Sequence, residues 1–95
     1  MDLITADFET YYSKDYSLSK MTTEEYIRDP QFEVVGVSVK VNNGEPEWAS
    51  GTMGQIKKYL QGFKWSGSMM LAHNTRFDGA IMSWHFGIQP KALAD

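Results

Sequence analysis

Two short acidic motifs, far apart in the chain, contain the residues best suited to chemistry. The first is Asp-Phe-Glu at residues 7–9, and the second is Asn-Thr-Arg-Phe-Asp at residues 74–78; each follows an apolar run. Alternate residues of a strand share a face, so Asp7 and Glu9 are expected side by side at the end of a buried strand. Asp78 falls in the first turn of a predicted helix, where a third carboxylate can converge on the first two.

Such a cluster of acids predicts a metal site. Carboxylates that lie close together repel one another, which raises their pKa values unless divalent cations neutralise them. Because the chain has no cysteine, a metal must be held by oxygen or histidine, which favours magnesium or manganese. In a two-metal site, one ion activates an attacking water and the other stabilises the leaving oxygen of a phosphoryl displacement. We therefore expect Asp7, Glu9 and Asp78 to be metal ligands and catalytic residues, with two Mg²⁺ or Mn²⁺ as cofactors.

Composition limits the chain to one folded unit. Its 95 residues are 42% hydrophobic, enough for one core but not for a second domain. No segment approaches the ~20 apolar residues of a membrane span, and the N-terminus lacks a signal sequence, so we expect a cytoplasmic protein without membrane association. A formal net charge of -3 provides no general basic surface for duplex DNA. Binding to nucleic acid would therefore depend on bound cations and local contacts.

The first half of the chain is predicted to contain a strand, a short helix and a hairpin. A loop is expected at residues 11–20, and Thr22 with Glu25 has the spacing of a capping box that opens a helix. Valines at 35, 37, 39 and 41 alternate with other residues, which predicts a strand with one buried face. Asn43-Gly44 is typical of a tight primed turn, and Pro46 places the return strand, residues 45–48, at a sheet edge.

The second half is predicted to contain two longer helices around a buried strand at residues 69–72. Thr52 and Gln55 form a second capping box. Two apolar stripes at helical spacing are expected to face the core: Met53, Ile56, Leu60 and Phe63, then Phe77, Ile81, Trp84 and Ile88. The order of elements indicates an α/β fold with a mixed sheet flanked by helices. Residues 91–94 have the pattern of another strand, so we expect the fold to continue past residue 95.

Together these motifs resemble the 3′→5′ exonuclease domain of family A DNA polymerases, particularly the phage-type enzymes. That domain belongs to the DEDD superfamily and has a ribonuclease H-like fold. Residues 7–9 match its first motif, and residues 74–78 match its second, Asn-x-x-Phe/Tyr-Asp. The resemblance spans the chain, including residues 16–41. It implies that residues 1–95 are a single, partial exonuclease domain with a ribonuclease H-like mixed sheet that is incomplete at the C-terminus.

The resemblance also implies an activity and its partners. The expected reaction is proofreading, a two-metal hydrolysis of single-stranded DNA from its 3′ end, with the polymerase domain of the parent protein as a partner. Thr10, Asn74 and Phe77 are implied to contact the substrate. The family carries a fourth carboxylate in a later Tyr-x-x-x-Asp or His-x-x-x-Asp motif, which this chain lacks, and Asp95 is in the wrong position to replace it. Weakened metal binding and poor or absent activity are therefore expected of the truncated chain.

Each candidate residue also has a purely structural explanation. Asp7 and Glu9 can be solvated residues that end an edge strand. An acid at position 78 is favoured by the helix dipole, and Asn74 is a good N-cap with or without a DNA contact. Phe77 begins the apolar stripe of its helix, so a core position explains it more simply than a base-stacking role.

Several residues near the motifs are weaker candidates. Loop aromatics can stack on unpaired bases or pack on the core, and exposed cations can meet phosphates or only solvent. The residues concerned are Tyr11, Tyr12, Tyr16, Lys14 and Arg76. His73 and His85 have no metal-ligand spacing, and both are interpreted as structural.

Two other functions remain open. A DEDD-type exonuclease can act on RNA, and relative rates on matched RNA and DNA strands would distinguish it, because such a site must accept or exclude the 2′-hydroxyl. The second alternative is a non-catalytic fragment of the same fold that binds nucleic acid or a protein partner. It predicts no manganese-dependent spectral shift at Asp7 or Asp78.

Overall fold

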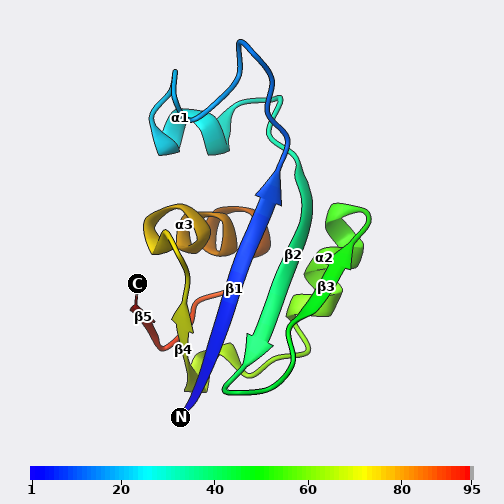
Figure 1. Cartoon of the computed structure of the whole chain (residues 1–95), viewed down its shortest axis with the longest axis vertical. Helices are drawn as coiled ribbons and strands as arrows, with labels where there is room; N and C mark the ends of the chain where they lie inside the picture. The colour runs from blue at the N-terminus through cyan, green and yellow to red at the C-terminus, as the bar shows by residue number, and fades with distance from the viewer. Residues whose placement is uncertain (95) are drawn as a thin grey trace.

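The central strand of the sheet carries the first acidic motif. The computed structural model describes residues 1–94, in which five strands have the order β3-β2-β1-β4-β5 (Figure 1). β1 (Asp2–Thr10) pairs antiparallel with β2 (Val34–Val41) and parallel with β4 (Ser68–Leu71). β3 (Glu47–Ser50) and β5 (Ala92–Ala94) form the edges. The mixed α/β class and the strand expected at residues 91–94 are thus confirmed.

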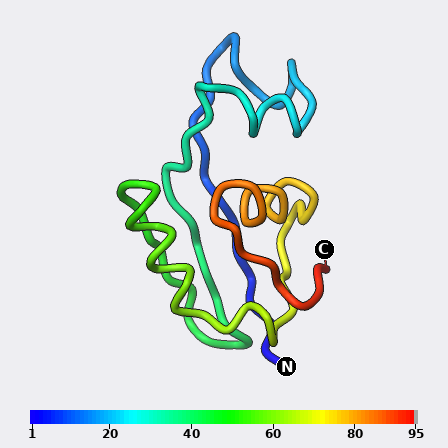
Figure 2. Tube along the Cα trace, turned by 180° about the vertical axis from the view of Figure 1, so that it is seen from behind, coloured from blue at the N-terminus to red at the C-terminus, as the bar shows by residue number. Residues whose placement is uncertain are grey.

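The helices leave one face of this sheet open. α1 (Thr23–Arg28) lies beyond the end of β1, while α2 (Met53–Leu60) and α3 (Thr75–Phe86) lie behind the sheet in Figure 1 and in front of it in Figure 2. α2 packs on β2 and β3, and α3 packs on β1 and β5. A short 3₁₀ helix, Trp65–Gly67, precedes β4. Among the described helices, none is long and apolar enough to cross a bilayer.

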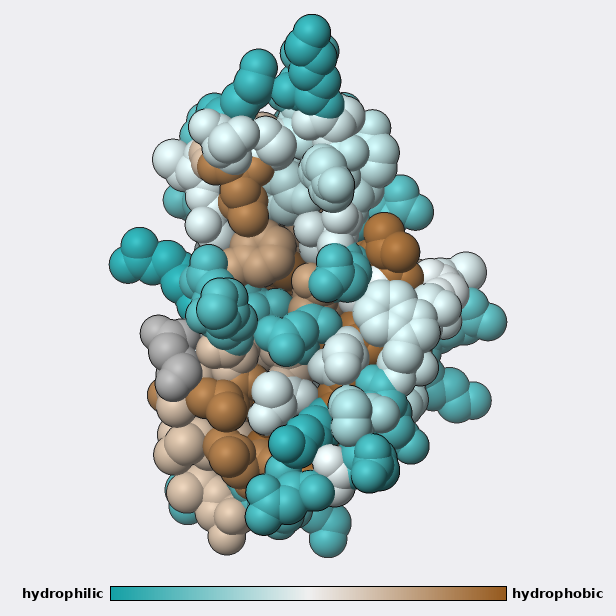
Figure 3. Space-filling model, viewed as in Figure 1, coloured by the Kyte–Doolittle hydropathy of each residue, from teal (hydrophilic) through white to brown (hydrophobic). Residues whose placement is uncertain are grey.

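Side chains on the two sheet faces differ accordingly. Ile4, Ala6 and Phe8 of β1 are buried against the helices, and the Phe8 ring stacks on Phe86 of α3 at 5.7 Å. The opposite face, seen in Figure 3, exposes apolar side chains around β4 and the start of β1, including Leu3. Because alternate residues of β1 belong to opposite faces, Asp7 and Glu9 lie on this helix-free face.

Local sequence signals define the helix ends as expected. Thr22 Oγ1 accepts from the Glu25 backbone N–H at 3.1 Å, and the Thr22 N–H donates to Glu25 Oε1 at 2.9 Å. Thr52 and Gln55 repeat the same reciprocal pair at the start of α2. Gly87 ends α3 with a φ of 64°, a left-handed conformation that glycine adopts without strain. Both predicted capping boxes are therefore confirmed.

The hairpin differs from its prediction at both ends. The pairing of β1 with β2 shifts register, because Glu9 pairs with Gly36 but Thr10 pairs with Val34. The residue skipped in β2, Val35, therefore points outward and is 49% exposed. The bulge moves Val34 onto the buried face in its place. At the other end, the turn is centred one residue early: Asn42 has a φ of 51°, and its Oδ1 accepts from the Leu3 N–H at 2.9 Å.

Two residues expected in the core are largely exposed. Trp84 is 45% exposed because it lies on the side of α3 that faces α1, where the guanidinium of Arg28 covers its ring. Met53 is exposed because it is the first residue of α2, and the buried stripe of that helix begins one turn later at Ile56. The remaining stripe residues pack in or against the core, with Ile56, Leu60 and Ile81 fully buried.

Candidate functional site

The unequal lengths of β1 and β4 create the site. β4 pairs only with Asp2–Thr5 of β1. On the side where β4 lies, the second half of β1 therefore has no neighbouring strand among the described residues. The first turn of α3 occupies this side. There the backbone N–H of Phe8 donates to Oδ1 of Asp78 at 3.0 Å, across 70 residues of sequence. The two acidic motifs are therefore joined directly, through one hydrogen bond from a backbone N–H to a side-chain carboxylate.

The acidic residues of both motifs line one cleft. It has a volume of about 580 Å³ and includes Asp7, Glu9 and Asp78, with Phe8, Leu18, His73, Asn74 and Phe77. Asp78 is only 4% exposed, whereas Glu9 is exposed to solvent. The backbone N–H of His73 approaches Oδ1 of Asp7 at 3.5 Å. All three acidic residues thus line one concavity.

Burial gives Asp78 unusual electrostatics. Loss of hydration, followed by the negative charges of Asp7 and Glu9, raises the pKa of its carboxyl from 3.8 to about 6. Hydrogen bonds from the backbone at Phe8 and Asn74 act in the opposite direction. The rise prevails because water is largely excluded from Asp78. A cation in the cleft would therefore relieve both the desolvation and the repulsion.

The three carboxylates are suitable ligands for a hard divalent cation, but their positions do not surround one. All three side chains offer carboxylate oxygens, the ligands that Mg²⁺ and Mn²⁺ prefer. Within residues 1–94, however, no three histidine or acidic side chains are close enough together to surround one ion. Binding of a metal by Asp7, Glu9 and Asp78 would require their side chains to move toward one another.

The residues implied to contact substrate occupy different positions. Asn74 is the N-cap of α3, where its side chain accepts from the Phe77 N–H at 3.4 Å, and it also lines the cleft. Phe77 is buried and lies 6.0 Å from the Tyr26 ring, so its main contact is with the core. Thr10 turns away from the cleft, and its hydroxyl lies 2.8 Å from that of Tyr26.

Tyr16 has a structural role and is unsuited to stacking on a base. It is 1% exposed, its ring stacks on Tyr26 at 4.5 Å, and its hydroxyl donates to the Tyr26 carbonyl at 2.5 Å. Burial also raises the pKa of Tyr16 to about 12. The base-stacking alternative is therefore wrong for this residue, whereas Tyr11 and Tyr12 remain exposed.

Two residues of the cleft were not predicted from the sequence. Leu18 comes from the loop after β1, and nothing in its type or spacing indicates a site. His73 was interpreted as structural, yet it lines the cleft; its place between β4 and the second motif is the signal that could have identified it. The structural interpretation holds for His85, whose Nε2 lies 2.9 Å from the Ile27 carbonyl oxygen.

Comparisons with known proteins do not add a relative. No family model matches the chain, and no curated protein is significantly similar to it. A functional assignment therefore depends on the motifs and on the cleft that they form.

Proposed function

We propose that this chain is the N-terminal part of a 3′→5′ exonuclease domain of a phage-type DNA polymerase, which removes nucleotides from single-stranded DNA. The hydrogen bond between the Phe8 N–H and Asp78 is the main support, because it joins the two motifs on which the resemblance depends. The sheet also agrees with a ribonuclease H-like fold: a hairpin flanks one side of β1, and a strand reached by a crossover flanks the other.

In this proposal, the residues of the cleft have distinct roles. Asp7, Glu9 and Asp78 hold two Mg²⁺ or Mn²⁺, which when bound supply an activated water and charge stabilisation at the leaving oxygen. Hydrogen bonds from the backbone at Phe8 and Asn74 hold the Asp78 carboxylate in place at the cleft. Asn74 caps the start of α3 and lines the cleft, where its side chain lies beside the incoming strand.

A cleavage assay with matched variants tests the proposal. A 5′-labelled single strand is incubated with the 95-residue chain in manganese or in chelator. We expect a slow, manganese-dependent ladder that shortens from the 3′ end. Asp7→Ala and Asp78→Asn should abolish it, whereas Asp15→Asn, which removes an exposed loop carboxylate, should not. Equal cleavage by wild type and Asp7→Ala would refute the proposal.

Substrate preference can be measured in the same assay. A DEDD-type RNA exonuclease would degrade an RNA strand of the same sequence faster than the DNA strand. We expect DNA to be degraded faster, and the opposite ratio would replace a proofreading role with RNA processing.

One observation favours a non-catalytic alternative. Among the described residues, the three carboxylates are not close enough together to surround an ion. A fragment that binds nucleic acid or protein without cleaving it does not need them to be. Manganese is paramagnetic, so an ion bound in the cleft broadens the amide resonances of nearby residues. Our proposal predicts broadening at Asp7 and Asp78 that is lost in Asp7→Ala. Absence of broadening in the wild-type chain, together with absence of cleavage, would favour the non-catalytic module.

A further inference from the structure

A second concave surface lies between α1 and α3, apart from the acidic cleft. It has a volume of about 420 Å³, and we call it the α1–α3 groove. Its α3 side consists of Arg76, Ala80 and Trp84, which recur every fourth residue and so form one stripe along the helix. Its α1 side consists of Thr22, Thr23 and Glu24. At a helical rise of 1.5 Å, Arg76 and Trp84 are separated by about 12 Å along α3.

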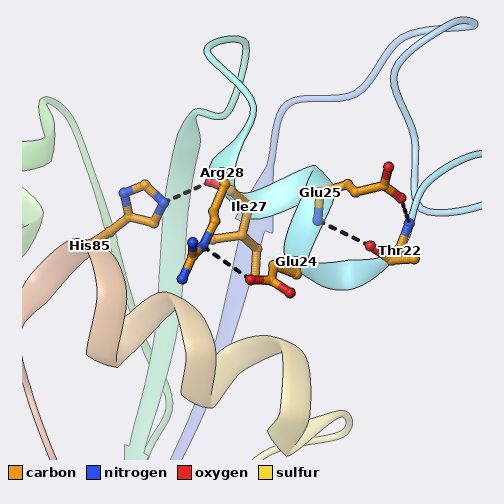
Figure 4. Close-up of polar contacts among 6 residues, drawn as sticks. All are labelled: Thr22, Glu24, Glu25, Ile27, Arg28 and His85. Carbon is orange, nitrogen blue, oxygen red and sulfur yellow. Dashed lines mark hydrogen bonds and ion pairs between the residues drawn. The ribbon is translucent and has the colours of Figure 1, made fainter.

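Contacts between the two helices hold this groove in place. The Nε2 of His85 on α3 lies 2.9 Å from the carbonyl oxygen of Ile27 on α1, and Phe32 stacks on the His85 ring at 4.5 Å. Figure 4 shows this contact, with Glu24 and Arg28 on the side of α1 that faces α3. The groove is therefore formed by two helices that are fixed to each other, rather than by a mobile loop.

Among the charged side chains at the groove in residues 1–94, one cation remains available to bind a ligand. Arg28 Nε lies 3.5 Å from Glu24 Oε1, and the Arg28 guanidinium carbon lies 4.5 Å from the centre of the Trp84 ring. Glu24 is thus paired, and Arg28 covers one face of the Trp84 indole, while the residue as a whole is 45% exposed. Within residues 1–94, Arg76 forms no ion pair.

This combination suits single-stranded nucleic acid. An exposed aromatic face stacks on a base of any sequence, and a nearby cation binds the backbone phosphate. The spacing also fits, because about 12 Å corresponds to roughly three stacked nucleotides at ~3.4 Å each. The groove therefore offers Arg76 to one phosphate and Trp84 to a base a few nucleotides away.

The groove and the acidic cleft lie on nearly opposite sides of the first turn of α3. Successive residues of a helix are about 100° apart, so Arg76 and Asp78, two positions apart, project about 160° from each other, Asp78 toward β1 and Arg76 toward α1. Phe77 lies between them, lining the cleft and contacting Tyr26 of α1. A strand whose 3′ end occupies the cleft would pass around the exposed N-terminal end of α3, at Asn74, to reach Arg76 and the groove.

We infer that the α1–α3 groove is a second binding site, which holds the single strand upstream of the 3′ end, with Arg76 at a phosphate and Trp84 stacked on a base. This inference rests on the proposed function, which identifies the strand as the occupant. It adds a site outside the acidic motifs and makes α1 part of substrate binding.

Binding without cleavage tests the groove separately from the reaction. A 5′-fluorescein-labelled 12-nucleotide oligothymidylate is titrated with the 95-residue chain in EDTA, and its fluorescence anisotropy is recorded. Loss of one base stack corresponds to about 1–3 kcal/mol, so Trp84→Leu should weaken binding about 5- to 150-fold. Trp84→Phe keeps an aromatic face and should bind within about threefold of wild type. Circular dichroism confirms that each variant is folded.

Salt dependence tests the arginine. Each phosphate contact to a single strand contributes about 0.7 to the slope of log K against log salt concentration. Arg76→Gln should lower the slope by about that amount. Lys58→Gln, which likewise replaces an exposed cation with glutamine but on α2, outside the groove, should not. Binding that is equal in wild type and Trp84→Leu, or undetectable in wild type, overturns the inference.

The failures of the two proposals are distinguishable. Trp84-dependent binding by a chain that shows neither cleavage nor manganese broadening at Asp7 and Asp78 supports the groove and refutes the exonuclease. Metal-dependent cleavage that is the same in wild type and Trp84→Leu supports the exonuclease and refutes the groove.

Discussion

Replacing Asp78 by asparagine should stabilise the fold at neutral pH and not at acidic pH. Asparagine keeps an oxygen that can accept from the Phe8 N–H, so the bond at 3.0 Å is retained while the charge is removed. The pKa of Asp78 rises from 3.8 to about 6 on folding, chiefly through burial. The folded state therefore binds the proton more tightly than the unfolded chain does. The stability that this tighter proton binding by Asp78 contributes is fully present below pH 3.8 and is lost as the pH rises through about 6.

The size of the effect follows from the shift. One pKa unit corresponds to about 1.4 kcal/mol, so the full rise would cost at most about 3 kcal/mol once Asp78 is ionised. Part of the rise comes from the charges of Asp7 and Glu9, which water in the cleft screens, and we therefore expect about 1–2 kcal/mol. At pH 8, Asp78→Asn should exceed wild type by this amount in its free energy of unfolding. At pH 4.5, which lies between the two pKa values, about a third of this difference should remain.

Urea denaturation followed by circular dichroism measures this difference at several pH values between 4.5 and 8. Asp15→Asn is the matched control, because it makes the same chemical change at an exposed loop position. The control should differ from wild type by less than about 0.5 kcal/mol throughout. A stability difference between Asp78→Asn and wild type that does not change with pH would refute the electrostatic reasoning.

Three further substitutions test packing and capping by urea denaturation. Gly36→Ala would place a Cβ 2.3 Å from the Trp48 ring and 2.8 Å from a backbone oxygen, so it should cost about 1–3 kcal/mol. Thr52→Ala removes the N-cap of α2 and should cost about 1 kcal/mol. Tyr16→Phe removes the hydroxyl bonded to the Tyr26 carbonyl at 2.5 Å and should cost about 1–2 kcal/mol.

Each of these variants has a control within the chain. Gly67→Ala adds the same methyl group where nothing lies within 4 Å, so a loss as large as that of Gly36→Ala would contradict the steric argument. Thr52→Ser keeps the capping hydroxyl and should retain most of the stability. Tyr12→Phe changes an exposed tyrosine. If it destabilised the protein as much as Tyr16→Phe, the buried hydrogen bond would not be the cause.

Local patterns predicted the elements, whereas contacts between distant segments decided their details. The capping boxes at Thr22 and Thr52 involve residues three positions apart, and both were identified from sequence. The turn at Asn42 depends on a bond to Leu3, 39 residues away, which no local pattern contains. The outward position of Val35 likewise follows from a bulge in the pairing of β2 with β1.

The same division applies to the site. Motif order and strand periodicity predicted that Asp7, Glu9 and Asp78 would converge, and the strand and the helix do carry them to one cleft, although within residues 1–94 they are not close enough together to surround an ion. The burial of Tyr16 was not predictable, since it depends on stacking against Tyr26 from a separate segment. Leu18 was missed for a similar reason: only the path of the loop after β1 brings it to the cleft.

The cost of an ionised Asp78 gives a reason to interpret it as a functional residue. A position selected only for stability would be occupied more favourably by a neutral residue, and an acid kept where its pKa is raised is typical of a site that binds a cation or a proton. If a cation offsets the cost, adding manganese at pH 8 should raise the melting temperature of wild type but not that of Asp78→Asn. An equal rise in both proteins would assign manganese to another part of the surface, and Asp78 would then be a structural acid.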